Sequence, residues 1–281
     1  MNTLSNNILE GNNVLKSQFS YDMYTAREKE IVNFLASKNV QVIRQHEQLN
    51  NLEPAVKDLA MFMGDNFKNI KRIYDLMKLN LSPVRTFSIS IENLTRQERE
   101  MSMAFAVKLQ NAKAISSYRL SCDKKNLIIA PVKSFTTCNF LTGHWFEYYI
   151  REKILAAVNS SVPGLDFACL SNLSIKLASG KYAEIDMMMR INGEYFLIEA
   201  KSGKLNIGIG QFYRLLNGLR IKTRNAFILM NEGAEQVINT CRNSLAFKVV
   251  NFERFISNFC DYLDKVALMS ATARKSAFIP A

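Results

Sequence analysis

The segment 182–201 constrains the fold more than any other stretch of this chain. It consists of two mainly apolar runs separated by Asn192-Gly193. Asn-Gly between such runs is typical of a tight β-hairpin, because both positions tolerate the positive φ angles that a two-residue turn requires. The sequence therefore predicts two antiparallel strands, over 183–191 and 195–200.

Four charged side chains on this hairpin are spaced two residues apart along their strands. Since side chains alternate between the faces of a strand, Glu184 and Asp186 share one face of the first strand. Glu199 and Lys201 share one face of the second. Their sequence neighbours are mainly apolar, and carboxylates beside a core are costly unless something neutralises them. Carboxylate oxygens are the ligands that Mg²⁺ and Mn²⁺ prefer, so this pattern predicts a divalent-cation site.

Such a set of groups suits phosphodiester hydrolysis. A bound divalent metal lowers the pKa of water and polarises phosphoryl oxygens. Lys201 lies one strand repeat beyond Glu199, where an ammonium can orient or deprotonate the attacking water, or offset developing charge. A lysine suits this place because its pKa can shift when the side chain is desolvated. The alternative interpretation is a salt-bridge ladder on an exposed edge hairpin.

A family resemblance supports the catalytic interpretation. Asp186, a hairpin and then Glu199-x-Lys201 resemble the D…(D/E)xK signature of the PD-(D/E)xK, or restriction-endonuclease-like, nuclease superfamily. The upstream Gly-x-Trp-x-Glu sequence that ends at Glu147 resembles the first motif of this superfamily, in which a helical glutamate reaches the metal site. Together with Glu184, the set resembles most closely the nuclease domains attached to CARF sensor domains in CRISPR ancillary nucleases.

The resemblance spans residues 140–219 and implies a fold and a ligand set. It implies an α/β, restriction-endonuclease-like core, with a mixed central sheet flanked by helices and preceded by an α-helical N-terminal region. It implies Mg²⁺ or Mn²⁺ held by Glu147, Glu184, Asp186 and Glu199, with Lys201 as a further catalytic residue. No proline precedes Asp186, and no CARF-like region is evident upstream, so activation by a cyclic oligonucleotide is not implied.

A basic stretch follows the hairpin. Between Lys201 and Asn225 there are five basic residues and no acidic one: Lys204, Arg214, Arg220, Lys222 and Arg224. This stretch fits a nucleic-acid-binding surface and a solvated face equally well. A helix is predicted over 209–219, and its N-terminus favours phosphate. By resemblance to related nucleases, Gln211 is a further catalytic candidate near the scissile phosphate, and Tyr213 an additional one.

Composition limits the partners and the class of protein. A net charge of +11 favours a polyanionic partner, because basic side chains that neutralise phosphates release counterions. DNA is favoured over RNA as the substrate. Five scattered cysteines without a CxxC pair, and only two histidines, disfavour a zinc site and a disulfide framework and fit a cytoplasmic protein. No membrane span is expected. The alternatives are a catalytically silent nucleic-acid-binding or scaffold protein on the same fold, and an RNA-directed nuclease.

The N-terminal half has a helical pattern. Apolar residues recur at three- and four-residue steps over 52–81, which predicts one helical stripe. A looser stripe over 31–49 predicts a second helix, and Pro54 suits the first turn of the helix that follows the joint near Asn51. The two helices could form an antiparallel hairpin or a dimerising coiled coil. We expect a homodimer through them.

Between these helices and the nuclease core we expect a small α+β module. A strand is predicted over 85–91, a helix from Asn93 or Thr95 to Ala112, and a hairpin over 118–129. This order is compatible with a winged helix, or with a linker subdomain that packs on the catalytic core. The expected segments are a flexible leader (1–20), a helical hairpin or coiled coil (21–84), the α+β module (85–138), the nuclease domain (139–268) and a loose tail (269–281).

Overall fold

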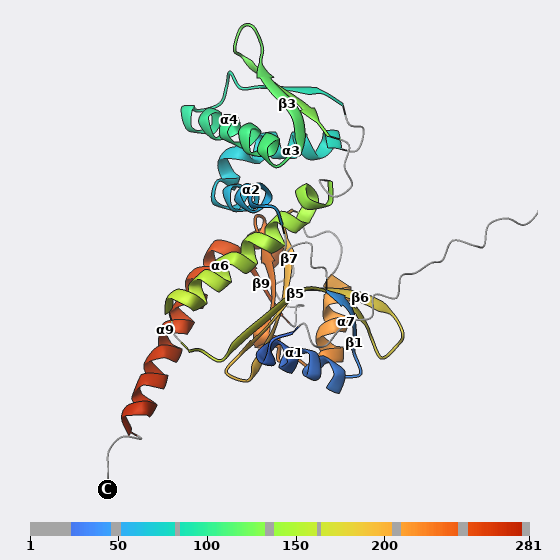
Figure 1. The fold of residues 1–281 in the computed structure, drawn as a ribbon, viewed down its shortest axis with the longest axis vertical. Helices are drawn as coiled ribbons and strands as arrows, with labels where there is room; N and C mark the ends of the chain where they lie inside the picture. Colours follow the sequence, from blue (N-terminus) through green and yellow to red (C-terminus); the bar gives the residue numbers. More distant parts are fainter. Residues whose placement is uncertain are drawn as a thin grey trace, which may run out of the picture.

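The computed structural model describes residues 24–45, 52–81, 85–132, 138–161, 164–203, 209–240 and 247–276 of the 281-residue chain. An α/β body carries a smaller module of helices and strands at one end (Figure 1). The predicted leader, the predictions for residues beyond 276 and the candidate Lys204 lie outside the described residues.

The body is built on a mixed sheet of six strands. Its spatial order is β1-β5-β6-β7-β8-β9, antiparallel from β1 to β7 and parallel from β7 to β9. The strands are β1 (Gln41–Gln45), β5 (Phe167–Lys176), β6 (Tyr182–Ile191), β7 (Glu194–Lys201), β8 (Ala226–Met230) and β9 (Lys248–Asn251). The predicted fold class, a mixed α/β core flanked by helices, is confirmed.

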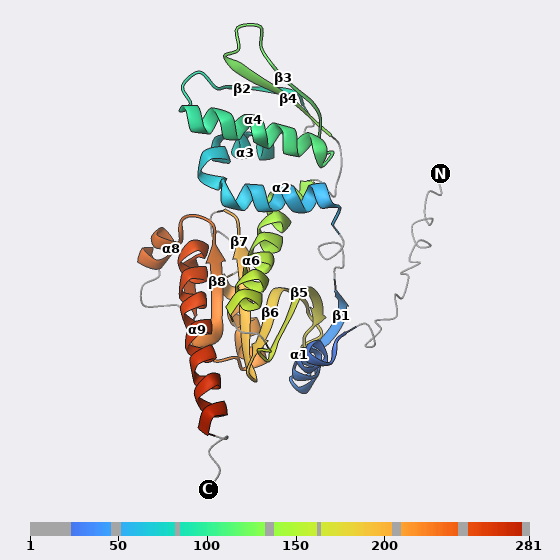
Figure 2. The same cartoon turned by 60° about the vertical axis from the view of Figure 1, so that its left-hand side comes forward.

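Helices cover both faces of this sheet (Figures 1 and 2). One face carries α6 (Trp145–Ser161) and α9 (Phe252–Ser276), and the other carries α1 (Ala26–Ser37) and α7 (Ile209–Leu219). Two buried apolar clusters lie between the layers, one on each face. The shorter elements are η3 (Phe140–His144), η4 (Thr223–Asn225) and α8 (Ala234–Thr240). None of the described helices is long and apolar enough to cross a membrane.

The module at the end of the sheet combines three helices with a three-stranded sheet of order β2-β4-β3. Thr95 caps α4: its side chain accepts a hydrogen bond from the Glu98 N–H, and the Glu98 side chain accepts one from the Thr95 N–H. The predicted helix start is thus confirmed at Thr95. The elements are α2 (Pro54–Asp65), α3 (Phe67–Leu81), β2 (Phe87–Ser90), α4 (Arg96–Asn111), β3 (Ile115–Leu120) and β4 (Asn126–Pro131).

Two secondary-structure predictions at the ends of the chain are wrong. The expected helix over 31–49 ends at Ser37, and the chain then forms β1, which pairs with β5 at the edge of the main sheet. Pairing with β5 buries Val40 and Val42, and this tertiary gain outweighs the helix-like spacing. At the other end α9 continues to Ser276, into the segment 269–281 that was expected to be a loose tail.

The stripe over 52–81 is also divided and buried. Asn66 interrupts it: its side chain donates a hydrogen bond to the Phe62 carbonyl, and α3 begins at the next residue. Leu59 and Ile70 are fully buried in a cluster that includes residues of α4 and α6. The expected dimerisation surface is therefore wrong, because the stripe is the core of this chain and is not open to a second copy. An added Cβ at Gly64 would lie 2.3 Å from the Tyr149 ring, so α2 approaches α6 closely.

Candidate active site

The predicted hairpin is confirmed at the turn between β6 and β7. Asn192 and Gly193 have φ angles of 47° and 79°, as the two-residue turn requires. Ile191 and Glu194 face each other across the turn. A turn of this length fixes the register of every later pair in the hairpin.

The two strands separate before they reach the candidate catalytic residues. Their ladder runs as far as the pair Met187 and Ile198, and continuing that register places Asp186 opposite Glu199. At this point the Ala200 N–H donates its hydrogen bond to Asp186 Oδ2, at 2.8 Å. The Asp186 side chain thus occupies the position of a backbone acceptor, at the point where β6 and β7 diverge.

The side-chain alternation of β6 breaks at the same residue. Met187 packs in the cluster beneath α6, whereas Ile185 packs in the cluster on the opposite face. The neighbouring strand has a matching irregularity, since the buried Asn172 of β5 has a left-handed φ of 55°. Because Ile185 turns toward α1 and α7, its neighbours Glu184 and Asp186 turn toward the face on which α6 begins. Glu184 and Asp186 thus share a face, as the sequence predicts, but the alternation does not continue from Ile185 to Met187.

Glu147 lies in the first turn of α6, directly after the π-helical turn η3. Its Oε2 atom is buried and has no hydrogen-bond partner among the described residues. Burial raises the pKa of Glu147 well above its usual range, and repulsion from Asp186 and Glu184 adds to this effect. The ammonium of Lys201 offsets part of it. Glu147 of α6 and the two carboxylates of β6 are therefore near enough to repel one another.

Asp186 shares these surroundings. Burial raises its pKa to about 7, and repulsion from Glu199 adds to the shift, while Lys201 and the Ala200 N–H oppose it. A carboxylate that titrates near neutrality inside an acidic cluster is typical of functional sites. It also indicates that the cluster lacks sufficient positive charge.

Lys201 forms an ion pair with Glu199, and both side chains are largely buried. Burial acts to lower the pKa of Lys201, but the attraction of Glu199 and Asp186 outweighs it, so the pKa is raised. The sequence prediction allowed for a pKa shift that would let this lysine deprotonate water. In these surroundings the shift has the opposite sign and keeps the side chain an ammonium.

The chemistry of the donors fits a hard cation, but their arrangement does not enclose one. The four acids offer only oxygen ligands, and Glu147 Oε2 has no other partner among the described residues. No group of three Asp, Glu, His or Cys side chains within the described ranges is arranged to hold a metal ion. Glu199 is instead paired with Lys201, and Asp186 accepts from Ala200. The cation therefore stays a prediction.

The basic stretch divides between the two ends of the sheet. Lys222 and Arg224 form ion pairs with Glu194, at 3.0 and 2.9 Å. Glu194 begins β7 and Lys201 ends it, so these two basic residues lie roughly 23 Å along the strand from the candidate site. The exposed Arg220, which directly follows α7, has a left-handed φ of 53° and lies in the same connection. These three residues therefore lie away from the carboxylates of the candidate site.

The remaining candidates lie on the first turns of α7. Gln211, Tyr213 and Arg214 are exposed there, while the neighbouring Phe212 and Leu215 are buried. Because β8 runs parallel to β7, the chain returns between them, and α7 starts toward the end of the sheet where β7 ends. A role for them in catalysis or phosphate binding stays a prediction.

Sequence reasoning missed several residues beside Lys201. The Asn231 N–H donates to the Lys201 carbonyl at 3.1 Å, and the Asn231 Nδ2 atom is buried without a hydrogen-bond partner among the described residues. Ser202 follows the motif directly and donates to the Thr142 carbonyl of η3, at 3.3 Å. Tyr74 of α3 reaches the same turn. The helical spacing around Tyr74 indicated only that this residue is buried in the core. Ser202, by contrast, could have been identified from the sequence because it directly follows Lys201.

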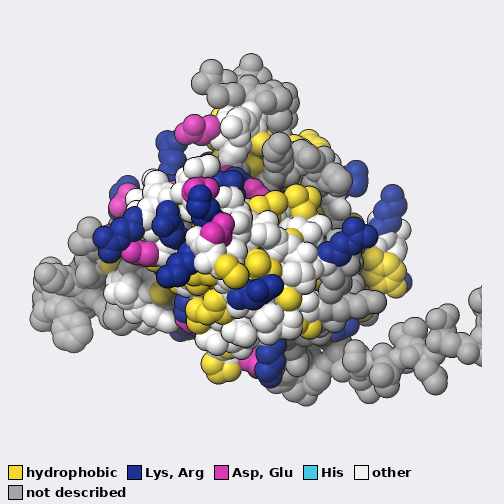
Figure 3. Space-filling view, turned by 90° about the horizontal axis from the view of Figure 1, so that it is seen from above, with side chains coloured by type: hydrophobic (Ala, Val, Ile, Leu, Met, Phe, Trp, Pro, Cys, Tyr) yellow, Lys and Arg dark blue, Asp and Glu magenta, His cyan; other side chains and the backbone are white. Residues whose placement is uncertain are grey.

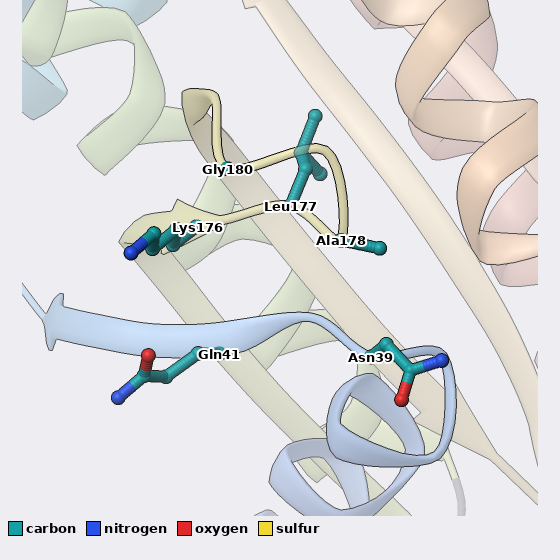
Figure 4. Close-up of a pocket in the computed structure, with 6 residues that line it drawn as sticks. All are labelled: Asn39, Gln41, Lys176, Leu177, Ala178 and Gly180. Carbon is teal, nitrogen blue, oxygen red and sulfur yellow. The ribbon is translucent and has the colours of Figure 1, made fainter.

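The surface does not show one continuous basic face over the module. Seen from above, Lys and Arg side chains are scattered among acidic and apolar ones (Figure 3). A cavity of about 580 Å³ lies at the edge of the sheet, near the turn between β5 and β6 (Figure 4). It is lined by Asn39, Gln41, Lys176, Leu177, Ala178 and Gly180, none of which is a candidate catalytic residue.

Comparison with known proteins identifies the fold. No protein-family model and no curated protein matches the chain. Among solved structures it is similar to protein VC1899 from Vibrio cholerae, at 14% identity and a TM-score of 0.55, covering 84% of this chain and 61% of that one. It is also similar to Can2 from Sulfobacillus thermosulfidooxidans, solved in complex with cyclic tetra-adenylate, at 13% identity and a TM-score of 0.53, covering 83% and 58%. The chain thus spans about three fifths of each protein and shares their fold.

Proposed function

We propose that this chain is a divalent-cation-dependent nuclease that hydrolyses phosphodiester bonds, with DNA favoured over RNA. One observation carries the proposal: the buried carboxyls of Glu147 and Asp186 lie where β6 and β7 diverge, beside the ion pair of Glu199 and Lys201. Burial and neighbouring carboxylates raise the pKa of both groups. Can2, which shares the fold over 58% of its own length, was solved in complex with cyclic tetra-adenylate.

The proposed ligands of Mg²⁺ or Mn²⁺ are Glu147, Asp186 and Glu199, with Glu184 as an accessory carboxylate. Added positive charge would stabilise the ionised forms of Glu147 and Asp186, whose pKa values are raised. It would also compete with Lys201 for Glu199, which frees the ammonium for other partners. The three-ligand arrangement would therefore form as the cation binds, with small side-chain movements.

The bound metal would supply an activated water and polarise the phosphoryl oxygens. Lys201, held as an ammonium, would attract the scissile phosphate and offset the negative charge that develops on it. The Ala200 N–H fixes one oxygen of Asp186 and leaves the other available. Gln211 and Arg214, on the first turns of α7, are proposed to contact the flanking phosphates, where the helix N-terminus also favours an anion.

The proposal is tested with Lys201→Ala in a plasmid-cleavage assay with Mg²⁺ or Mn²⁺. We expect wild-type cleavage that requires the cation, and a loss on the order of 100- to 1,000-fold in the variant, as when one electrostatic contact to a transition state is removed. DNA binding, measured by fluorescence anisotropy with a labelled duplex, should change little. A labelled RNA of the same sequence, run in parallel, decides between the two substrates.

Lys181→Ala is the matched control, because Lys181 is an exposed lysine in the turn before β6. It should cleave like the wild type. If Lys201→Ala cleaves at the wild-type rate, the proposed mechanism is wrong. If the wild type binds nucleic acid but never cleaves it, the catalytically silent alternative is correct, and the closed pair of Lys201 with Glu199 is then a structural feature.

A further inference from the structure

One buried hydroxyl joins three segments around the candidate site. The Tyr74 hydroxyl donates a hydrogen bond to the Leu141 carbonyl at 2.8 Å and accepts one from Trp145 Nε1 at 3.0 Å. It also lies within hydrogen-bonding reach of the Ser202 side chain. Tyr74 is 1% exposed, so no solvent competes for these bonds. A single atom of α3 therefore contacts the start of α6 and the residue that follows Lys201.

The π-helical turn η3 explains why a hydroxyl is needed here. Such wide turns interrupt the regular i→i+4 bonding of a helix and free carbonyl groups, which must find other partners when they are buried. Leu141 and Thr142 both lie in η3, and their carbonyls accept from Tyr74 and Ser202 respectively. The two side chains together satisfy two carbonyls of the turn.

The rings around Tyr74 make this link rigid. The Tyr74 ring meets the Trp145 ring edge-on, with the centroids 5.9 Å apart, and Phe67 stacks on Trp145 at 5.6 Å. An ion pair of 2.8 Å between Lys71 and Glu232 further fixes α3 to the end of β8. The module thus rests on the catalytic end of the sheet through α3.

We propose that Tyr74 is a positioning residue for the nuclease site. Its hydroxyl holds η3 through the Leu141 carbonyl, next to the bond that Ser202 makes to the same turn, and so sets the separation between Glu147, three residues beyond η3, and Lys201, the neighbour of Ser202. The inference rests on the proposed function, since it concerns the geometry of the same site. Its consequence is that the α2–β4 module is a structural part of the catalytic site and not a separate appendage.

The test uses Tyr74→Phe, which keeps the ring and removes only the hydroxyl. Trp145 is the single tryptophan of the chain and lies two residues before Glu147, so its fluorescence reports both the broken bond and cation binding. We expect a changed emission maximum in the metal-free protein. In Mg²⁺ titrations followed by the same signal, affinity should fall on the order of tenfold, as for other groups that orient metal ligands. Cleavage at saturating Mg²⁺ should fall in the same direction.

Tyr149→Phe is the matched control. Its hydroxyl, also on the module side of α6, donates to Asp65 Oδ1 of α2 at 2.9 Å and so makes a comparable link away from the site. Both variants should lower the melting temperature. Only Tyr74→Phe should change the Mg²⁺ affinity, whereas Tyr149→Phe should stay within about twofold of the wild type, because it orients no proposed ligand.

Ser202→Ala provides a second and milder test of the same link. It should weaken Mg²⁺ binding in the same direction, and its effect should shrink in the Tyr74→Phe background, because two groups in one hydrogen-bond network are not additive. If Tyr74→Phe and Ser202→Ala change only the melting temperature, as Tyr149→Phe does, the positioning role is wrong and the proposed function stands. If the wild type neither binds Mg²⁺ nor cleaves, the proposed function itself fails.

Discussion

The two ends of the β6–β7 ribbon hold carboxylates in opposite surroundings. At the turn end, Glu194 is partly exposed and accepts hydrogen bonds from Lys222 and Arg224, which hold its pKa below the usual range. At the other end, burial raises the pKa of Asp186 to about 7, although the Ala200 N–H donates to it. Among the described residues, two basic side chains pair with the single carboxylate Glu194 at the turn end, whereas Lys201 at the other end lies beside several buried carboxylates.

This difference separates a paired surface charge from the charges of the proposed site. The same two strands carry both groups, so neither residue type nor secondary structure distinguishes them. What differs is the number of cations within reach and the access of water. An acidic cluster that its own protein leaves short of positive charge has a reason to bind a cation, and a paired surface glutamate has none.

The largest contrast is expected in the response to a divalent cation. A ligand present at a hundred times its dissociation constant stabilises the folded state by about 2.7 kcal/mol. We therefore expect Mg²⁺ to raise the melting temperature of the wild type, and a chelator to reverse this. Asp186→Asn should abolish the shift, because the amide keeps the bond from Ala200 but loses the charge.

Glu194→Gln is the control at the turn end and should show the full Mg²⁺ shift. Scanning calorimetry of the three proteins, with and without Mg²⁺, provides the comparison. An equal shift in wild type and Asp186→Asn would show that any cation binds elsewhere.

A second contrast, of opposite sign at the two ends, is expected in the pH dependence of the metal-free protein. Between the unfolded pKa of an aspartate, about 4, and the folded value of about 7, the folded state holds the Asp186 proton and the unfolded state has lost it. Stability should therefore fall as the pH rises through this window. Glu194, whose folded pKa is lowered, contributes stability above its unfolded pKa and loses it as the pH falls through the folded value.

Melting temperatures from about pH 2 to 8 in the presence of a chelator should show both effects, because the lowered pKa of Glu194 lies below that of an ordinary glutamate. The difference between Asp186→Asn and the wild type should grow toward pH 7, and the difference for Glu194→Gln should shrink toward low pH. If the difference in melting temperature between Asp186→Asn and the wild type stays constant across this range, the pKa of Asp186 is not raised by its surroundings.

The smallest effect concerns the turn itself. Gly193 has a φ of 79°, and an added Cβ would meet nothing within 4 Å. Gly193→Ala should therefore cost only the backbone strain of a left-handed residue, about 1–2 kcal/mol. Chemical denaturation should show this loss while Mg²⁺ affinity stays unchanged. A lost Mg²⁺ response would mean that the turn end and the site end are coupled more tightly than their separate surroundings indicate.

Several elements were predictable because their causes are local. Asn192-Gly193 set the turn, and the turn set the register that brings Asp186 opposite Glu199. Thr95 and Glu98 set the start of α4 by bonding to each other's backbone. In each case the interacting residues are close in sequence, so the pattern alone contains the information.

Other features depend on partners far apart in the chain. The strand β1 exists because β5 lies beside it, and nothing near Val42 in sequence distinguishes this strand from a helix. The stripe over 52–81 had the right spacing, but whether it faced a second copy or α6 of the same chain depended on how the helices pack. The sequence pattern also could not show that Lys222 and Arg224 pair with Glu194, at the end of the ribbon away from the site.

By itself, the sequence determined which acidic groups lie on the hairpin and in what order, because strand period and turn chemistry act over a few residues. Only the tertiary structure decided their environment. The turn of Ile185 to the opposite face, the approach of Glu147 and the hydroxyl of Tyr74 all depend on contacts between distant segments. Burial and neighbouring charge set a carboxylate's pKa, and both are properties of the packed molecule.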